Sequence, residues 1–252
     1  MPDSVLHNIK SSDPFGRYSS PGVISAFSLR SDKNMSLCYG DTAGSLDNRR
    51  RFLGPLGIDY RDLTGAKQVH GDHVVCVRGK DKGKGALSYD SAIENTDALI
   101  TAEKGLPLAI LTADCLSVFL YDPGHQAIGL VHAGWRGSQK GICVKAVEAM
   151  REYFQSDPLS LRAGFGPSIR QCCFETGEEL EEAFPQDIVK RDGRFYLDLP
   201  GVNFRQLLKV GLKQKNIFDP LLCTFCQADD FFSFRREKDS SGRILSVIML
   251  KR

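Results

Sequence analysis

One stretch, residues 106–137, constrains the fold more than any other part of the chain. Two apolar runs, Leu116–Tyr121 and Ala127–Val131, flank the sequence Asp-Pro-Gly-His, which is a strong turn signal. Short apolar runs separated by a turn are typical of two adjacent antiparallel strands. The sequence therefore predicts a hairpin close to the middle of the chain.

The position of the turn predicts which residues of this hairpin lie opposite each other. If the hairpin is centred on Pro123–Gly124, Phe119 pairs with Ile128 and Cys115 pairs with His132. Directly opposed Cβ atoms lie roughly 4.5–5.5 Å apart, so one ion could take a thiolate at ~2.3 Å and an imidazole at ~2.0–2.1 Å. A three- or five-residue loop would shift the pairing by one residue and separate the two side chains.

Strand and helix patterns alternate along the rest of the chain. Further strands are expected at Val23–Leu29, Ala66–Val69, Val74–Val77, Ala98–Thr101, Leu108–Leu111, Leu161–Phe165 and Ile244–Leu250. Helices are expected at Thr42–Leu56, Ser138–Phe154, Gly177–Phe184 and Val202–Lys213. This order predicts an α/β or α+β fold, with mixed sheets flanked by helices in one layered domain over residues 1–252.

Two local expectations concern the ends of the chain. Residues 1–21 are expected to form a peripheral or poorly ordered segment of the domain. Near the other end, the turn at 238–242 separates FFSFRR from RILSVIML, which predicts a terminal hairpin.

Composition argues against several classes of partner. The formal net charge is +2, and the Lys and Arg residues are scattered, so neither nucleic acid nor a membrane surface is an expected partner. The dense run 49–51 is expected to be a solvated helix face. No apolar stretch approaches the ~20 residues of a membrane span, and the N-terminal sequence does not resemble a secretory signal. The eight cysteines are expected to be free thiols in a reducing cytoplasm.

Two imidazoles and one thiolate can hold zinc or copper and leave a coordination position open. Cys115 and His132 provide one ligand each, and the third could be His70 or His73. Spacing alone does not rank these two histidines.

The segment after His132 suggests an anion site. Its glycines would allow a ligand to approach the backbone closely, and Arg136 could make a bidentate contact with phosphate or carboxylate. The alternative interpretation is a simple strand-to-helix turn in which Trp135 fills part of the core. Glu175, which follows Cys172-Cys173, could enter a site or interact with a helix dipole.

Other cysteines have less specific interpretations. Cys223 and Cys226 form a C-x-x-C pattern, but a zinc ribbon needs a second pair and a thioredoxin-like site needs a strand-to-helix context. A structural role is therefore favoured for them. Isolated cysteines most often pack as small hydrophobic residues, as expected for Cys38, Cys76 and Cys143.

Several motifs resemble those of the YfiH-like family, whose members have been labelled multicopper polyphenol oxidases or laccase-domain proteins. The matching segments are QVHG, TDALIT, TADC, VHAGWRG, GPSIRQCCFETGEEL and FFSFRR, and the resemblance runs from about Phe27 to the C-terminus. It implies mixed sheets flanked by helices and a metal site, usually zinc, at His70, Cys115 and His132. It also implies phosphorolysis of adenosine, inosine and methylthioadenosine, with adenosine deamination as a side activity.

The resemblance extends to further details. A bacterial member has been linked to editing of peptidoglycan precursors. The family's Asn-Arg pair matches Asn48-Arg49, so Arg49 is a candidate contact for substrate or phosphate. The chain departs from the family pattern in a shortened segment, LRSDKNMSLCYGD, and in Ser117, which replaces a common proline. Neither change removes a proposed ligand.

The first functional hypothesis is a metalloenzyme that acts on purine nucleosides and phosphate. In deamination, zinc, or copper as the alternative, would activate a water for attack on C6 of adenine. In phosphorolysis, phosphate would displace the base at the ribose C1′, held by Arg49 or Arg136. Asp114 and Glu175 are candidate proton donors to the leaving purine.

Other functional classes remain open. A metal-free cysteine hydrolase or amidase would use Cys115 as nucleophile and His132 as base. A multicopper oxidase is disfavoured by the number of histidines. One blue-copper centre takes two histidines and a cysteine, and the chain has five histidines in all, too few for the remaining copper sites of such an enzyme. A non-enzymatic binding module is the remaining alternative.

Overall fold

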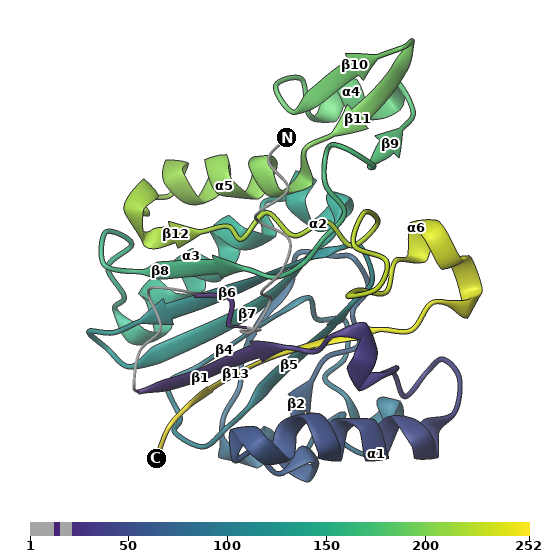
Figure 1. Cartoon of the computed structure of the whole chain (residues 1–252). Coiled ribbons are helices and arrows are strands. Elements are labelled where there is room, and N and C mark those ends of the chain that lie inside the picture. Colours follow the sequence, from purple (N-terminus) through teal and green to yellow (C-terminus); the bar gives the residue numbers. More distant parts are fainter. Residues whose placement is uncertain (1–12, 16–21) are drawn as a thin grey trace.

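Four layers make up most of the molecule, which we describe from a computed structural model for residues 13–15 and 22–252. One helix covers a four-stranded sheet, this sheet packs on a six-stranded sheet, and further helices cover the opposite face of the second sheet (Figure 1). A small three-stranded sheet projects beyond these layers. The predicted class, mixed sheets flanked by helices in a single α/β domain, is confirmed.

The four-stranded sheet is mixed. Its strands lie in the order β1 (Val23–Phe27), β13 (Ile244–Leu250), β5 (Leu108–Thr112) and β2 (Thr64–Gly65). The pairs β1–β13 and β13–β5 are antiparallel, whereas β2 runs parallel to β5. The last strand of the chain therefore lies between two earlier strands.

The six-stranded sheet contains the predicted hairpin. Its strands lie in the order β12 (Ile217–Phe218), β8 (Arg162–Phe165), β6 (Leu116–Asp122), β7 (Ala127–Ala133), β4 (Ala98–Thr101) and β3 (Val74–Cys76). The strands β6 and β7 pair antiparallel at its centre, as predicted.

The three-stranded sheet was not predicted. It is formed by β10 (Ile188–Arg191), β11 (Arg194–Leu197) and β9 (Glu175–Thr176). Its strands are short, and Leu197 is their one buried residue. The sequence therefore lacks the apolar runs that mark buried strands.

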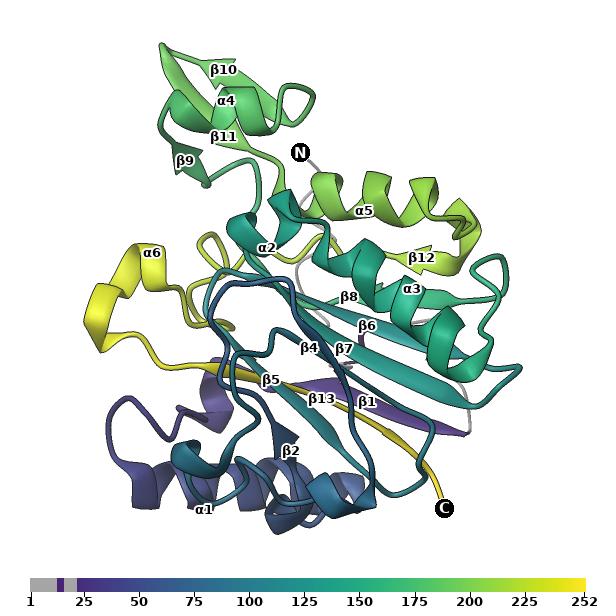
Figure 2. The same ribbon diagram turned by 180° about the vertical axis from the view of Figure 1, so that it is seen from behind.

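The helices complete the outer layers. They are α1 (Thr42–Leu53), α2 (Trp135–Gln139), α3 (Ile142–Phe154), α4 (Glu179–Ala183), α5 (Leu199–Lys209) and α6 (Phe234–Glu237). Figure 2 shows α3 lying along the six-stranded sheet on the face opposite α1. The predicted helix Ser138–Phe154 is interrupted at Gly141, whose φ of 75° lies in the left-handed region.

Burial on both faces explains why β6 reads as one apolar run. Val118 and Leu120 pack with the helices α3 and α5, whereas Phe119 and Tyr121 pack between the two large sheets. In β13, Val247 belongs to a third cluster with α1. Side-chain alternation along each strand thus fills separate cores on the two faces of its sheet.

Two expectations for local structure are wrong. The segment Ala66–Val69 is not a strand, because β2 ends at Gly65 and only Ala66 makes an isolated bridge, to Ile93. The terminal hairpin is absent, because β13 pairs with β1 and β5 while α6 occupies part of FFSFRR. These partners lie far away in the sequence, so local patterning could not indicate them.

Of the segment expected to be peripheral or poorly ordered, residues 1–21, the structure describes only residues 13–15. Residues 1–12 and 16–21 lie outside the described residues, but the side chain of Phe15 is 1% exposed. Its ring packs edge-on against the rings of Phe119 and Tyr121, with centroids 6.3 and 6.4 Å away. This segment therefore contributes a side chain to the core between the sheets.

No helix among the described residues is both long enough and apolar enough to cross a bilayer.

The position of Phe15 can be tested by substitution. Phe15→Ala removes a buried ring, so we expect the free energy of unfolding in urea to fall by about 3 kcal/mol. Tyr153→Ala is the matched control, because Tyr153 is 54% exposed on α3, and its effect should stay within about 0.5 kcal/mol. Equal, small effects of both substitutions would show that Phe15 does not pack in the core.

Candidate metal centre and substrate cavity

Side chains from three separate segments meet at one end of the central hairpin. One ligand atom from each of His70, Cys115 and His132 lies within 4.8 Å of the other two. We call these residues the central cluster. Cys115 directly precedes β6, His132 lies near the end of β7, and His70 lies in the loop between β2 and β3.

The hairpin brings two of these side chains together in a register that differs from the predicted one. Ser117, not Cys115, pairs with His132, because the loop between the strands contains four residues. The partner expected for Cys115 thus moves by two positions, to Gly134. Because side chains alternate with a period of two, this even shift keeps Cys115 and His132 on the same face.

A buried carboxylate positions the other members of the cluster. Asp97, which is 0% exposed, lies just before β4. It accepts hydrogen bonds from the backbone N–H groups of Val69, His70 and Gly71 at 3.2, 3.0 and 2.8 Å. It also lies 2.7 Å from Nδ1 of His132, which leaves Nε2 of that ring for a ligand.

These contacts distinguish His70 from His73. The backbone of His70 is left-handed, with a φ of 59°, and its ring lies 4.9 Å from that of His132. The ring of His73 instead lies against the backbone carbonyl of Asn95, 3.1 Å from Nδ1. Of the two candidates, His70 is therefore the one that the fold brings into the cluster.

The charges of the cluster depend on one another. Burial alone would raise the pKa of Cys115, but His132 and His70 outweigh this effect and lower it to about 6. Burial alone would lower the pKa of His132, but Cys115 and Asp97 raise it to about 9. Burial also acts to raise the pKa of Asp97, yet His132 and the backbone donors hold it below the usual value.

This donor set fits a single metal ion. The cluster presents two imidazoles and a thiol that ionises easily, with one imidazole oriented by a carboxylate, as in many zinc sites. Three protein ligands leave a coordination position for water or substrate, which is the pattern of catalytic rather than structural zinc.

The central cluster opens into a cavity of about 590 Å³, a volume typical of small-molecule sites. Aromatic side chains line much of it: Tyr39, Tyr89, Trp135, Phe174 and Phe234. Two arginines, Arg235 and Arg243, also line it. The Thr112 hydroxyl at its wall is buried and has no hydrogen-bond partner among the described residues.

The structure places the predicted anion contacts outside this cavity. Arg49 is 4% exposed, and its guanidinium donates to the backbone carbonyls of Met35, Gly85 and Ala86 at 2.9, 3.1 and 2.9 Å. Arg136 is exposed, with its guanidinium stacked 4.3 Å from the Trp135 ring centroid. Neither side chain lines the cavity, although Trp135 does.

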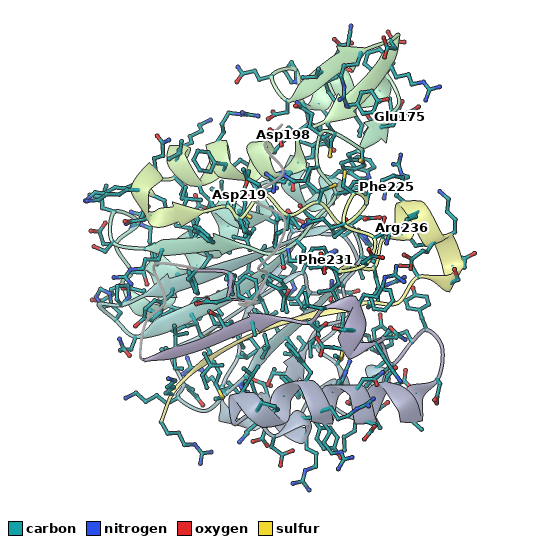
Figure 3. All side chains as sticks on the ribbon, in the orientation of Figure 1. Glu175, Asp198, Asp219, Phe225, Phe231 and Arg236 are labelled. Carbon is teal, nitrogen blue, oxygen red and sulfur yellow. The ribbon has the colours of Figure 1, made fainter. Side chains whose placement is uncertain are left out.

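The two predicted acids lie in different settings. Asp114 lines the cavity, but its carboxylate accepts from the Thr224 hydroxyl and from the backbone N–H of Arg235, both at 2.6 Å. Glu175 lies in β9, a strand of the small sheet (Figure 3), and pairs with Arg194 at 3.2 Å. It is not among the residues that line the cavity.

Sequence reasoning missed several groups of this site. Asp97 belongs to the TDALIT motif, but nothing local shows that its carboxylate reaches the His70 loop. Arg235 follows the FFSF run and Arg243 directly precedes β13, and only the tertiary fold aligns them with the central cluster.

Comparisons with known proteins identify relatives of the whole chain. The family model described as "Multi-copper polyphenol oxidoreductase laccase" matches residues 21–251. The purine nucleoside phosphorylase YlmD of Geobacillus stearothermophilus is 31% identical over 225 residues, covering 85% of this chain and 82% of the relative. Adenosine deaminase RL5, from an unknown prokaryotic organism, is 33% identical over 241 residues, covering 91% of each.

Two solved structures of related proteins have the same fold as this chain. The crystal structure of YlmD from G. stearothermophilus aligns with a TM-score of 0.88 at 29% identity, covering 95% of this chain and 94% of the other. That of YfiH from Bacillus licheniformis aligns with a TM-score of 0.87 at 30% identity, covering 91% and 93%. The chain therefore belongs to the multi-copper polyphenol oxidoreductase laccase family, as its resemblance to YfiH-like proteins predicts.

Proposed function

We propose that this chain is a zinc-dependent purine nucleoside phosphorylase that can also deaminate adenosine. The observation that carries the proposal is the central cluster at the wall of a cavity lined by aromatic side chains and two arginines. The relatives named purine nucleoside phosphorylase and adenosine deaminase support the same chemistry.

The cavity offers suitable groups for a nucleoside. Aromatic rings provide flat apolar faces on which a purine can stack. Tyr39, Tyr89 and Phe234 remain 52%, 37% and 44% exposed, so their rings are accessible to a ligand. The unpartnered hydroxyl of Thr112 is available to a polar atom of the ligand.

Positive charge for phosphate comes from the same wall. Arg243 uses Nη1 to donate to the carbonyls of Ser241 and Gly242, and its guanidinium lies 4.4 Å from the Tyr39 ring centroid. Arg235 uses Nη1 to donate to the carbonyl of Glu175. Because a guanidinium has five N–H donors, both arginines keep donors for a phosphate. We therefore propose Arg235 and Arg243, rather than Arg49 or Arg136, as phosphate contacts.

The reaction is then a substitution at the ribose C1′. An oxygen of hydrogen phosphate forms a bond to C1′ while the bond to the purine nitrogen breaks. The purine leaves with the electron pair, and the proton that the phosphate gives up ends on the purine. Arg235 and Arg243 would orient the phosphate, and stacking would hold the purine. Zinc, when bound by the central cluster, supplies Lewis acidity and, for deamination, a water that is acidic near neutral pH.

A copper oxidoreductase is disfavoured by the available ligands, although the family description includes that activity. Among the described residues, the groups that could hold a metal contain one set with histidine, the central cluster. The ring of His125 lies 2.8 Å from the carboxylate of Asp122 on the hairpin turn, and that of His73 lies against a backbone carbonyl. His7 lies outside the described residues.

We also propose that the protein works in the reducing cytoplasm. All eight cysteines are free, and Cys38, Cys172 and Cys226 are exposed. Exposed free thiols persist most readily in a reducing compartment.

A metal-free cysteine hydrolase or amidase, for instance one that edits peptidoglycan precursors, is the second candidate. It is favoured by the lowered pKa of Cys115 and by the Asp97 carboxylate behind His132, an arrangement similar to a Cys-His-Asp triad.

The first experiment removes the thiolate of the central cluster. Cys115→Ala should lower phosphate-dependent release of hypoxanthine from inosine by more than about 100-fold, because a direct ligand matters at least as much as the groups that orient one. Cys76→Ala is the matched control, a half-buried thiol in β3 outside the central cluster. Release at the wild-type rate by Cys115→Ala protein would rule out the proposed phosphorylase.

A second experiment tests the orienting role of Asp97. Asp97→Asn should weaken zinc binding by about 10–100-fold, measured by competition with a chromophoric chelator, because the amide no longer holds the His132 ring and the His70 loop as an anion does. Asp122→Asn is the control, since it alters a similar carboxylate–imidazole pair at the hairpin turn. Equal zinc affinity in the two variants would contradict this role.

The third experiment separates the two candidate functions. In metal-free protein, the rate of Cys115 alkylation by iodoacetamide should rise through about pH 6 and level off by about pH 7, because the thiolate is the reactive form. Burial raises the pKa of Cys76, so that thiol should react slowly throughout. Turnover by metal-free protein that alkylation abolishes would favour the hydrolase, whereas activity that returns only with zinc would favour the phosphorylase.

A further inference from the structure

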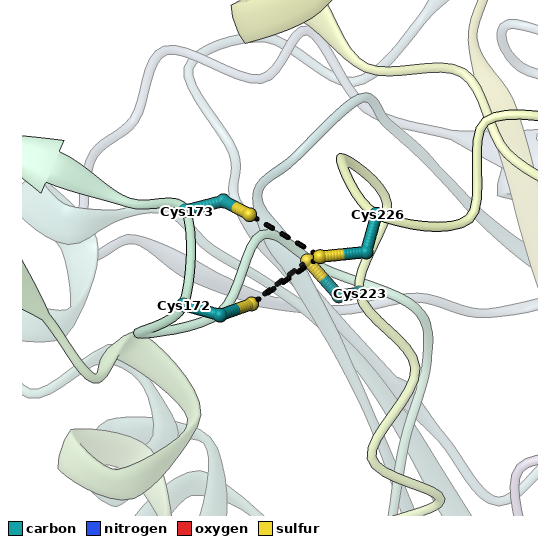
Figure 4. Close-up of side chains that lie close together, drawn as sticks. All are labelled: Cys172, Cys173, Cys223 and Cys226. Atoms are coloured by element: carbon teal, nitrogen blue, oxygen red, sulfur yellow. Dashed lines mark hydrogen bonds between the residues drawn. The ribbon is translucent and has the colours of Figure 1, made fainter. Parts of the chain in front are cut away.

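A second group of sulfur atoms lies apart from the central cluster. Cys172 and Cys173 follow β8, and Cys223 and Cys226 follow β12, yet their sulfur atoms all lie within 4.8 Å of one another. Figure 4 shows the four side chains converging from these two segments. We call them the four-cysteine cluster. The second pair that the C-x-x-C pattern lacked in the sequence is supplied by the fold.

The distances suit one ion and leave no room for a larger group. Sγ of Cys173 lies 3.2 Å from that of Cys226, and Sγ of Cys172 lies 3.5 Å from those of Cys223 and Cys226. Four sulfurs at the zinc–sulfur bond length of ~2.3 Å stand about 3.8 Å apart in a tetrahedron. The cluster thus needs only a slight expansion to surround a zinc ion.

Packing does not account for the cluster. A cysteine that acts as a small hydrophobic residue is usually buried, but Cys172 and Cys226 are exposed and only Cys223 is fully buried. The four thiols are free rather than joined in disulfides. A shared cation would explain why they converge at the surface.

We propose that Cys172, Cys173, Cys223 and Cys226 bind a structural zinc ion as four thiolates. One zinc ion takes the place of the four thiol protons, which pass to solvent, and no electron transfer is involved. All four positions are then filled by protein, which is the pattern of structural rather than catalytic zinc. This ion is additional to the one proposed for the central cluster.

The surroundings offset the charge of such a site. A zinc ion with four thiolates has a net charge of −2. Arg191 donates from Nη2 to the carbonyls of Gln171 and Cys172 at 2.7 and 3.3 Å. Arg236 donates from Nη1 to the carbonyls of Thr224 and Phe225, both at 2.8 Å. A guanidinium thus lies against each of the two ligand segments.

The ion would hold together two segments that line the substrate cavity, one after each cysteine pair. Phe174, directly after the first cysteine pair, lines the cavity, and so does Arg235, in the segment after the second pair. The Thr224 hydroxyl, between Cys223 and Cys226, bonds to Asp114 beside the central cluster. Figure 3 labels Phe225 and Arg236, which lie in this second segment.

The test uses the full chain without a histidine tag, purified in reductant and free of chelator. Cys115→Ala removes the thiolate of the central cluster, so any thiolate-to-cobalt charge-transfer band after cobalt loading must come from other cysteines. We expect this variant to show that band, to retain about one equivalent of zinc by mass spectrometry, and to show four sulfur neighbours at about 2.3 Å by zinc X-ray absorption.

Adding Cys172→Ser and Cys226→Ser to Cys115→Ala should abolish both the band and the retained zinc. Adding Cys76→Ser instead is the control and should change neither. Measurements on the Cys115→Ala variant alone decide the matter if the triple variant fails to fold. The proposal is overturned if Cys115→Ala protein shows no thiolate–cobalt band, or if alkylation before reduction finds the four cysteines paired in disulfides.

Discussion

The geometry of the site depends on the buried carboxylate of Asp97. An ionised carboxylate without contact with water is tolerated only where donors surround it. Here the donors are three backbone N–H groups of the His70 loop and the ring of His132. The groups that compensate the charge are therefore the groups that hold two ligands in place. This is how a loop outside any strand reaches a defined position beside the end of β7.

Much of the fold could be predicted, because strands covered on both faces or alternating between two cores leave strong patterns. The bounds of β4 and β13 match the prediction, and those of β6 and β7 are one or two residues longer. Local patterning fails where distant partners decide the structure. The position of β13 between β1 and β5, and the burial of Phe15 against Phe119, depend on contacts that no local pattern records.

The site was predictable to a more limited extent. The hairpin argument brought Cys115 and His132 together although its register was wrong, since a shift by an even number of residues keeps side chains on their face. Spacing left His70 and His73 equal, and only the family resemblance favoured His70. The contact with Asp97 that places His70 in the cluster is not visible in local sequence. The C-x-x-C pattern of Cys223 was visible, but its partner pair lies in another loop. Likewise, Arg235 and Arg243 reach the cavity only through the tertiary fold.

The absence of a side chain at two positions sets the size of the central cluster. A Cβ atom at Gly134 would lie 3.0 Å from Cδ2 of His70 and 3.1 Å from Sγ of Cys115, and one at Gly137 would lie 2.7 Å from the carbonyl oxygen of Gly71. A methyl group at Gly137 would displace the backbone of the His70 loop, and one at Gly134 would crowd the His70 ring and the Cys115 sulfur. Two residues that offer no ligand atom therefore make room for the ligands, and a search restricted to donor atoms would overlook them.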